Sequence, residues 1–114
     1  MSLLSEVTEI AKTIKLQVET GVFTSAPPDE YIVLTPIADG FDLLADDAPN
    51  FETQEVRISL FTKGNYMKLK DILTRAFIKS EMTVTDRRYI AHEDDTGYHH
   101  YAIDVAKTYE WRNG

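Results

Sequence analysis

Histidine and carboxylate side chains gather in one short segment of the chain, and their chemistry suggests a metal site. His92 precedes an acidic run at 93–95, and His99 and His100 follow shortly after it. Imidazole and carboxylate groups are the usual ligands of zinc and related metals. If the segment folds as a hairpin, His92 would face His99 or His100 across the strands, with a carboxylate as third ligand.

The spacing of these residues matches no fixed metal-binding motif such as HExxH. We therefore predict no metal site and interpret the side chains as solvated polar groups at the tip of a hairpin. A small cytoplasmic metal- or ligand-binding domain that uses His92, His99 and His100 is the alternative function from a different class.

A second acidic group lies in the middle of the chain. Its members are Asp39, Asp42, Asp46, Asp47, Glu52 and Glu55. A calcium loop of the EF-hand type needs a different spacing and flanking helices, and paired catalytic carboxylates need a cleft that the sequence does not indicate. We expect a charged, solvated loop, with Asp42, Asp46 and Asp47 as candidates for binding a partner and ordering on contact.

No catalytic signature accompanies these residues. Gly64 stands outside any phosphate-binding glycine motif, and no serine lies in a nucleophile elbow. The chain has no cysteine, so thiol catalysis, disulfides and cysteine-based zinc sites are excluded. The sequence predicts a protein that is not an enzyme and needs no cofactor.

Charge and hydropathy exclude further classes. The net charge of −7 argues against wrapping nucleic acid, because affinity for phosphates comes from clustered cations. Arg57, Arg87 and Arg88 lie among acidic residues, so we predict ion pairs between subunits for them. No apolar run approaches the roughly 20 residues that span a bilayer, and the first residues do not resemble a signal peptide.

The first half of the chain predicts one helix and one strand before an uncertain region. Apolar residues at spacings of three and four indicate an amphipathic helix over 3–19. A strand follows at 31–37, and Pro36 places its end at a sheet edge or outside the sheet. Region 38–50 contains several turn formers, so a long loop or a weak hairpin is expected there.

The second half is more regular. Alternating apolar residues predict a strand over 51–62, and an apolar stripe predicts a helix over 66–79 with Asn65 as its N-cap. Two strands, 82–92 and 98–110, follow, joined by the loop 94–97. The order α-β-(β)-β-α-β-β indicates a single α+β domain over 1–114, with two helices packed on a mainly antiparallel twisted sheet and a long C-terminal hairpin.

Aromatic residues exceed what one small core consumes, so some are candidates for interface anchors. Long strands that end beyond the core also leave sheet edges that can pair with a neighbour. The candidate interface residues are Asp42, Asp46, Asp47, Arg57, Arg87, Arg88, Tyr89, Tyr98, Tyr101, Tyr109 and Trp111.

Three segments together resemble the tail-completion (tail-terminator) proteins of long-tailed bacteriophages and prophages. They are Val56-Arg-Ile-Ser-Leu-Phe-Thr-Lys-Gly-Asn-Tyr66, Val84-Thr-Asp-Arg-Arg-Tyr89 and Glu93-Asp-Asp-Thr-Gly-Tyr-His-His-Tyr-Ala-Ile-Asp-Val-Ala-Lys-Thr-Tyr109. In that family the middle strand runs into a helix through a short polar turn, and the final hairpin carries a similar Thr-Gly-Tyr turn. The resemblance covers residues 28–110.

The resemblance implies a virion protein that is assembled in the host cytoplasm and forms a ring, usually hexameric, at the head-proximal end of the tail tube. Its partners would be further copies of itself, the tail tube protein and the head connector or stopper protein, and DNA would pass through the lumen without specific binding. Ribbon 82–110 is then the candidate for reaching a neighbouring subunit, and region 38–55 for gripping the tube or connector. Another head–tail joining role, as a stopper or adaptor, is the alternative within the structural class.

Overall fold

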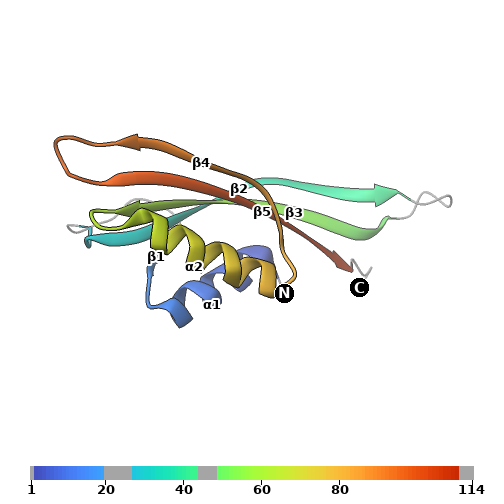
Figure 1. The fold of residues 1–114 in the computed structure, drawn as a ribbon. Coiled ribbons are helices and arrows are strands. Elements are labelled where there is room, and N and C mark those ends of the chain that lie inside the picture. Colours follow the sequence, from blue (N-terminus) through green and yellow to red (C-terminus); the bar gives the residue numbers. More distant parts are fainter. Residues whose placement is uncertain (1, 20–26, 44–48, 111–114) are drawn as a thin grey trace.

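The computed structural model describes residues 2–19, 27–43 and 49–110, with the backbone alone at 41–43 and 49–50. In these residues two helices lie on one face of a five-stranded sheet (Figure 1). The elements are α1 (Leu3–Ile14), β1 (Gln17–Glu19), β2 (Glu30–Leu43), β3 (Pro49–Thr62), α2 (Tyr66–Lys79), β4 (Thr83–His92) and β5 (His99–Glu110).

The sheet is mixed but mostly antiparallel. Its strand order is β1-β2-β3-β5-β4, in which β1 is parallel to β2 and every other neighbouring pair is antiparallel. The predicted α+β class and the order α-β-β-β-α-β-β are confirmed. The sheet edges are therefore formed by β1 together with the exposed part of β2 on one side, and by β4 on the other.

Helix α1 is shorter than the sequence predicted. Its N-terminus is capped by Ser2, whose hydroxyl accepts a hydrogen bond from the Ser5 backbone. The helix ends at Lys15, which adopts a left-handed conformation with φ 68° and ψ 33°. The predicted helix over 3–19 is thus wrong at its C-terminal end, because this turn redirects the chain and Val18 reaches the core from strand β1.

Strand β2 is longer than predicted and forms a hairpin with β3. Asp39 and Gly40, two turn formers, lie inside the strand because they pair with Gln54 and Thr53 of β3. The hairpin interpretation of 38–50 is confirmed for the strand residues, and the long-loop alternative is wrong for them. The hairpin tip, 44–48, lies outside the described residues.

The elements from α2 onward follow the prediction closely. The Asn65 side-chain oxygen accepts hydrogen bonds from the backbone N–H groups of Met67 (3.1 Å) and Lys68 (3.2 Å), which fixes the start of α2. In the loop between β4 and β5, Gly97 has a φ of 83°, a left-handed conformation that glycine adopts without strain.

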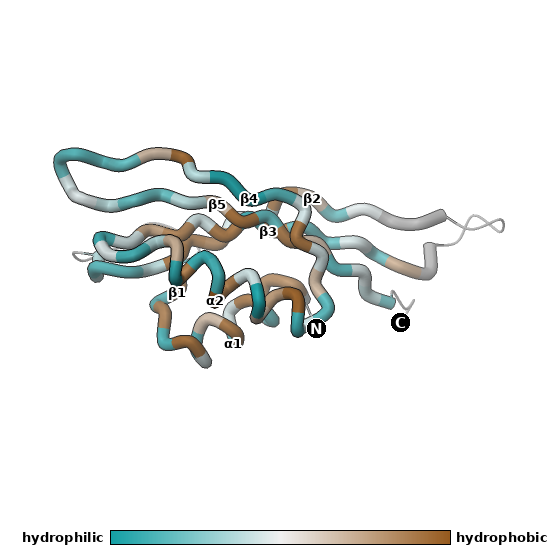
Figure 2. The backbone as a smooth tube through the Cα atoms, in the orientation of Figure 1, coloured by the Kyte–Doolittle hydropathy of each residue, from teal (hydrophilic) through white to brown (hydrophobic). Residues whose placement is uncertain are grey.

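The hydrophobic core lies between the helices and the sheet face that they cover. Leu73 and Phe77 of α2 and Val7 of α1 are fully buried against this face. The central strands contribute the buried side chains Ile32, Leu34, Val56, Ile58, Leu60, Tyr101, Ile103 and Val105. Figure 2 shows the hydrophobic segments on the helices and central strands, whereas the end of the β4–β5 hairpin is mainly hydrophilic.

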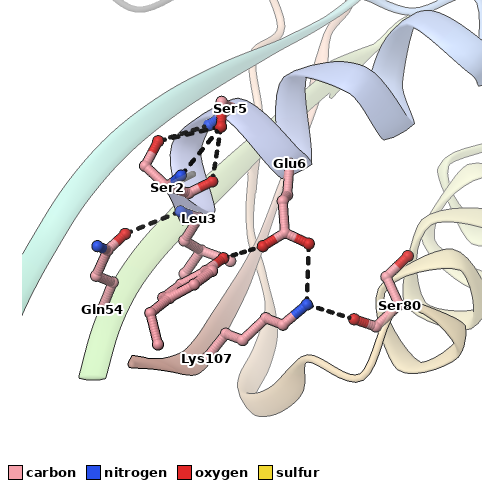
Figure 3. Close-up of polar contacts among 8 residues, drawn as sticks. Ser2, Leu3, Ser5, Glu6, Gln54, Ser80 and Lys107 are labelled. Carbon is pink, nitrogen blue, oxygen red and sulfur yellow. Dashed lines mark hydrogen bonds and ion pairs between the residues drawn. The ribbon is translucent and has the colours of Figure 1, made fainter. Parts of the chain in front are cut away.

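A polar network fastens α1 to the end of β5 (Figure 3). The Lys107 ammonium donates to Glu6 Oε1 at 2.9 Å and to the Ser80 carbonyl oxygen at 3.0 Å, and the Tyr109 hydroxyl donates to Glu6 Oε2. Ser80 caps the C-terminus of α2. The network therefore joins both helices to the strand that carries the C-terminal hairpin.

Candidate assembly interface

Strand β4 is an exposed edge of the sheet. Every one of its side chains is exposed except Val84, which is half-buried. Its inner edge pairs with β5, and its outer edge has no strand partner among the described residues. An unpaired edge presents backbone donors and acceptors to any strand of matching length. The edge therefore offers a surface for pairing with another chain.

The second free edge belongs to β2. Strand β1 pairs only with Tyr31, Ile32 and Val33, so β2 carries no outer partner within the described residues from Leu34 onward. Residues 35–40 are exposed. Pro36, which the sequence placed at an edge, lies in this segment, as expected for a residue without a backbone N–H.

The two long hairpins extend toward opposite ends of the molecule (Figure 1). The β4–β5 loop lies at one end and the β2–β3 hairpin at the other, and the principal extents are 55 × 27 × 24 Å. The helices cover only the middle of the sheet. The described parts of both hairpins therefore extend beyond the part of the sheet that the helices cover (Figure 1).

An aromatic cluster lies on the helix-covered face near the β4–β5 loop. Tyr66 of α2 contacts Tyr89, His99 and Tyr101, with ring centroids 5.0, 5.2 and 5.9 Å away. Tyr101 is only 7% exposed, so it belongs to the core and is removed from the candidate interface anchors. Tyr89 is 42% exposed and remains a candidate.

The three histidines do not form one site. His92 and His99 face each other across the strands with ring centroids 4.6 Å apart, as predicted for a hairpin. His92 Nδ1 is 3.1 Å from Asp94 Oδ1. His100 points to the opposite face because side chains alternate along a strand. The described residues contain no group of three potential ligands that could hold a metal.

On the bare face of the sheet, His100 is packed as a core-like aromatic residue. Its ring stacks on Phe61 at 4.3 Å, and Phe61 stacks on Tyr31 at 4.9 Å. Burial lowers the pKa of His100, which favours the neutral imidazole. Tyr98 packs edge-on against this stack and is 5% exposed, so it is also removed from the candidate anchors.

Arg57 makes an ion pair within the chain. Its Nε and Nη2 atoms donate to the two carboxylate oxygens of Asp104 at 2.9 and 3.0 Å. These hydrogen bonds and the charge of Asp104 raise the pKa of Arg57. The predicted ion pair between subunits is therefore replaced by an internal pair that ties β3 to β5.

Arg87 and Arg88 are the predicted cations that remain at the surface. Arg88 Nε lies 3.4 Å from Asp86 Oδ2, and both side chains are about half exposed. Arg87 donates to the Thr74 hydroxyl over 3.4 Å and has no ion-pair partner among the described residues. Both cations lie on the free edge strand and are available to a partner.

The other predicted interface residues are either packed or not described. Tyr109 is half-buried and donates to Glu6, and burial together with this contact raises the pKa of its hydroxyl. The Tyr109 side chain therefore packs within the chain. Asp42 is described only by its backbone, opposite Phe51 in the β2–β3 hairpin. Asp46, Asp47 and Trp111 lie outside the described residues.

Sequence reasoning missed two exposed isoleucines at the free edges. Ile37 of β2 is 42% exposed and Ile90 of β4 is 45% exposed. Each lies where the pairing register shifts, between Pro36 and Ala38 and between Tyr89 and Ala91. A bulge re-aims the side chain it contains. The only signal in the sequence that could have located these isoleucines is an interruption in the alternation of side chains along each strand.

In comparison with known proteins, no family model and no curated sequence matches the chain. None of the helices in the described residues is long and apolar enough to cross a membrane.

Proposed function

We propose that the chain is a structural subunit of a long-tailed bacteriophage or prophage. Copies of the chain form a ring, hexameric as in the family that it resembles, at the head-proximal end of the tail tube. The ring ends tube polymerisation and joins the tail to the head. The ring acts by assembly, without catalysis or a cofactor. It is assembled in the host cytoplasm and forms part of the virion.

The observation that carries this proposal is the exposed edge strand β4 within an elongated hairpin. Long exposed edges are usually covered or shortened in monomeric proteins, because they invite pairing with other chains. Here all but one of the β4 side chains are exposed. A strand with this exposure suits a subunit whose edge is covered on assembly.

The second support is the placement of the two hairpins. Because they extend toward opposite ends of the molecule (Figure 1), one subunit can contact different partners at its two ends. A terminator needs such surfaces for the tail tube protein on one side and the head connector or stopper protein on the other. The distal part of the β2–β3 hairpin lies within region 38–55, which the family resemblance makes the candidate for contacts with the tube or connector.

The net charge of −7 supports a lumen through which DNA passes without specific binding. Acidic surfaces repel phosphates and leave few cations to retain the double helix. The internal pairing of Arg57 with Asp104 further reduces the free cationic surface on the bare face of the sheet.

An in vitro polymerisation assay tests the proposal. Tail tube protein from the same phage is allowed to polymerise with the purified chain, and tube lengths are measured by negative-stain electron microscopy. We expect shorter tubes and the chain at one tube end, detected by a gold-labelled tag. An equal amount of heat-denatured chain is the control.

Unchanged tube lengths with no labelled ends would contradict the terminator role. Labelled ends on tubes of unchanged length would instead move the chain to the alternative joining role, as a stopper or adaptor that binds the tail without ending its growth.

A further inference from the structure

The two free edges of the sheet have the same length. Strand β4 has 10 residues. The outer edge of β2 that β1 leaves uncovered runs over 34–43, which is also ten residues. We infer that β4 of one copy pairs antiparallel with residues 34–43 of β2 in the next copy. This inference rests on the proposed ring and names the contact that closes it.

Charge disfavours pairing of β4 with itself. A two-fold antiparallel pair sets side chains of the same face opposite each other, so the two registers nearest to full overlap of Thr83–His92 place Arg87 opposite Arg87 or Arg88 opposite Arg88. Like charges directly opposite each other across strands are destabilising. The cations on this edge therefore oppose a symmetric dimer but leave pairing with an acidic edge open.

The edge of β2 supplies the opposite charge. When β4 is laid antiparallel along 34–43 in full overlap, Arg87 falls opposite Asp39. Both side chains are exposed, and neither has an ion-pair partner among the described residues. In the same alignment Tyr89 falls beside the bulge between Pro36 and Ala38 that contains Ile37, and the Tyr89 and Ile37 side chains are each 42% exposed. One contact thus pairs opposite charges and covers two exposed apolar side chains.

The faces of the two strands also agree in this alignment. Arg87 pairs with Ile103 of β5, and Asp39 pairs with Gln54 of β3, so both lie on the helix-covered face. Arg88 falls opposite Ala38, and both lie on the bare face because their partners are Ala102 and Glu55. The helices of successive copies therefore stay on one side of a continuous sheet.

Pairing of two different edges is a heterologous contact. Each copy offers β4 to one neighbour and β2 to the other, so the contact propagates and closes into a ring when the rotation between copies allows it. The antiparallel sense matches the other long pairs of the sheet. A symmetric dimer would instead consume one edge and leave the other free.

Thiol cross-linking tests the pairing, because the chain has no cysteine of its own. Ala38→Cys and Arg88→Cys variants are prepared with tags of different mass, mixed at high concentration and treated with a short bis-maleimide. We expect cross-linked pairs that contain one copy of each variant, formed faster than pairs within either variant alone. Ile78→Cys, at a 59% exposed helix position, measures random collision.

A charge exchange in the same assay tests the register. Asp39→Arg added to the Ala38→Cys chain, or Arg87→Asp added to the Arg88→Cys chain, should slow mixed cross-linking roughly fivefold, because attraction between the strands becomes repulsion. Mixing the two altered chains should restore the rate. A general disturbance of the strands would not be rescued by this combination.

Two results would overturn the inference. Rapid cross-linking of Arg88→Cys with itself would mean that β4 pairs symmetrically, and mixed cross-linking no faster than with Ile78→Cys would mean that these edges do not meet. If the chain shortens the tubes but no mixed cross-links form, the ring proposal stands and the ring is closed by a different interface. Mixed cross-links without an effect on tubes would instead reject the terminator role and leave self-assembly by the two edges.

Discussion

The Glu6 network gives a prediction whose magnitude follows from its contacts. The Glu6→Gln variant keeps the shape of the side chain and removes its charge. Glu6 and Lys107 are 17% and 21% exposed, so their ion pair is largely shielded from water. Glu6 accepts hydrogen bonds from Lys107 and from the Tyr109 hydroxyl (Figure 3).

Hydrogen bonds to charged groups contribute about 1.5–3 kcal/mol each, and Gln retains one acceptor oxygen. We therefore expect Glu6→Gln to lower the free energy of unfolding by about 1–3 kcal/mol at neutral pH. Lys107 keeps its bond to the Ser80 carbonyl oxygen at 3.0 Å, which limits the loss. Urea denaturation followed by circular dichroism measures the difference.

The difference in the free energy of unfolding between the Glu6→Gln variant and the original chain should depend on pH. Burial by itself raises the pKa of Glu6, but hydrogen bonds from Tyr109 and Lys107 and the charge of Lys107 outweigh it, so the pKa lies below its ordinary value of 4.5. Because the folded-state pKa is the lower one, the stabilisation is complete above 4.5 and is lost as the pH falls through the folded-state value. The variant and the original chain should converge in acid.

Glu9→Gln is the matched control. Glu9 lies one turn further along the same helix, pairs with Lys12 at 3.5 Å, and is 74% exposed. Exposed pairs of this kind contribute about 0–1 kcal/mol. Equal losses for Glu6→Gln and Glu9→Gln, or a Glu6→Gln difference that persists unchanged in acid, would refute the assignment of Glu6 to a shielded charged network.

Three further substitutions test the packing of the domain by urea or thermal unfolding. Phe77→Ala empties a fully buried site and should cost about 3–5 kcal/mol, whereas Ile78→Ala, at a 59% exposed site, should cost much less; similar losses would contradict the assigned helix face. Asn65→Ala removes the N-cap of α2 and should cost about 1 kcal/mol, and no loss would mean that the cap hydrogen bonds are not formed in solution. Gly97→Ala forces a side chain into a positive φ and should cost about 1 kcal/mol, while Gly40→Ala has open space and no positive φ and should be neutral; the reverse order would contradict the loop conformation.

Elements that depend on local signals could be predicted from the sequence. Helix α2 has the predicted bounds because an apolar stripe, the Asn65 cap and the preceding turn all lie within a few residues. The final hairpin and the positive φ of Gly97 follow from equally local patterns. The α+β class required only the order of these elements.

Elements that depend on pairing between distant segments could not be predicted. Val18 belongs to β1 because it pairs with Ile32, although its spacing fits the preceding helical stripe. Asp39 and Gly40 favour a turn locally, but pairing with β3 holds them in a strand. Tertiary contacts override weak local preference in both cases.

The candidate interface was predictable only in part. The sequence identified Arg87, Arg88 and Tyr89 as surface residues of a long strand, and they lie on the free edge. It could not separate them from Tyr98 and Tyr101, which are buried by contacts from other strands. Burial of an aromatic residue depends on its neighbours in space, which spacing along the chain does not specify.

Electron microscopy of lysates from the parent phage with this gene disrupted tests the central claim most directly. We expect free heads beside overlong or irregular tails, and restored particles when the gene is supplied in trans. Free heads beside tails of normal length would assign the chain to head–tail joining alone. Intact infectious particles without the gene would contradict the structural role altogether.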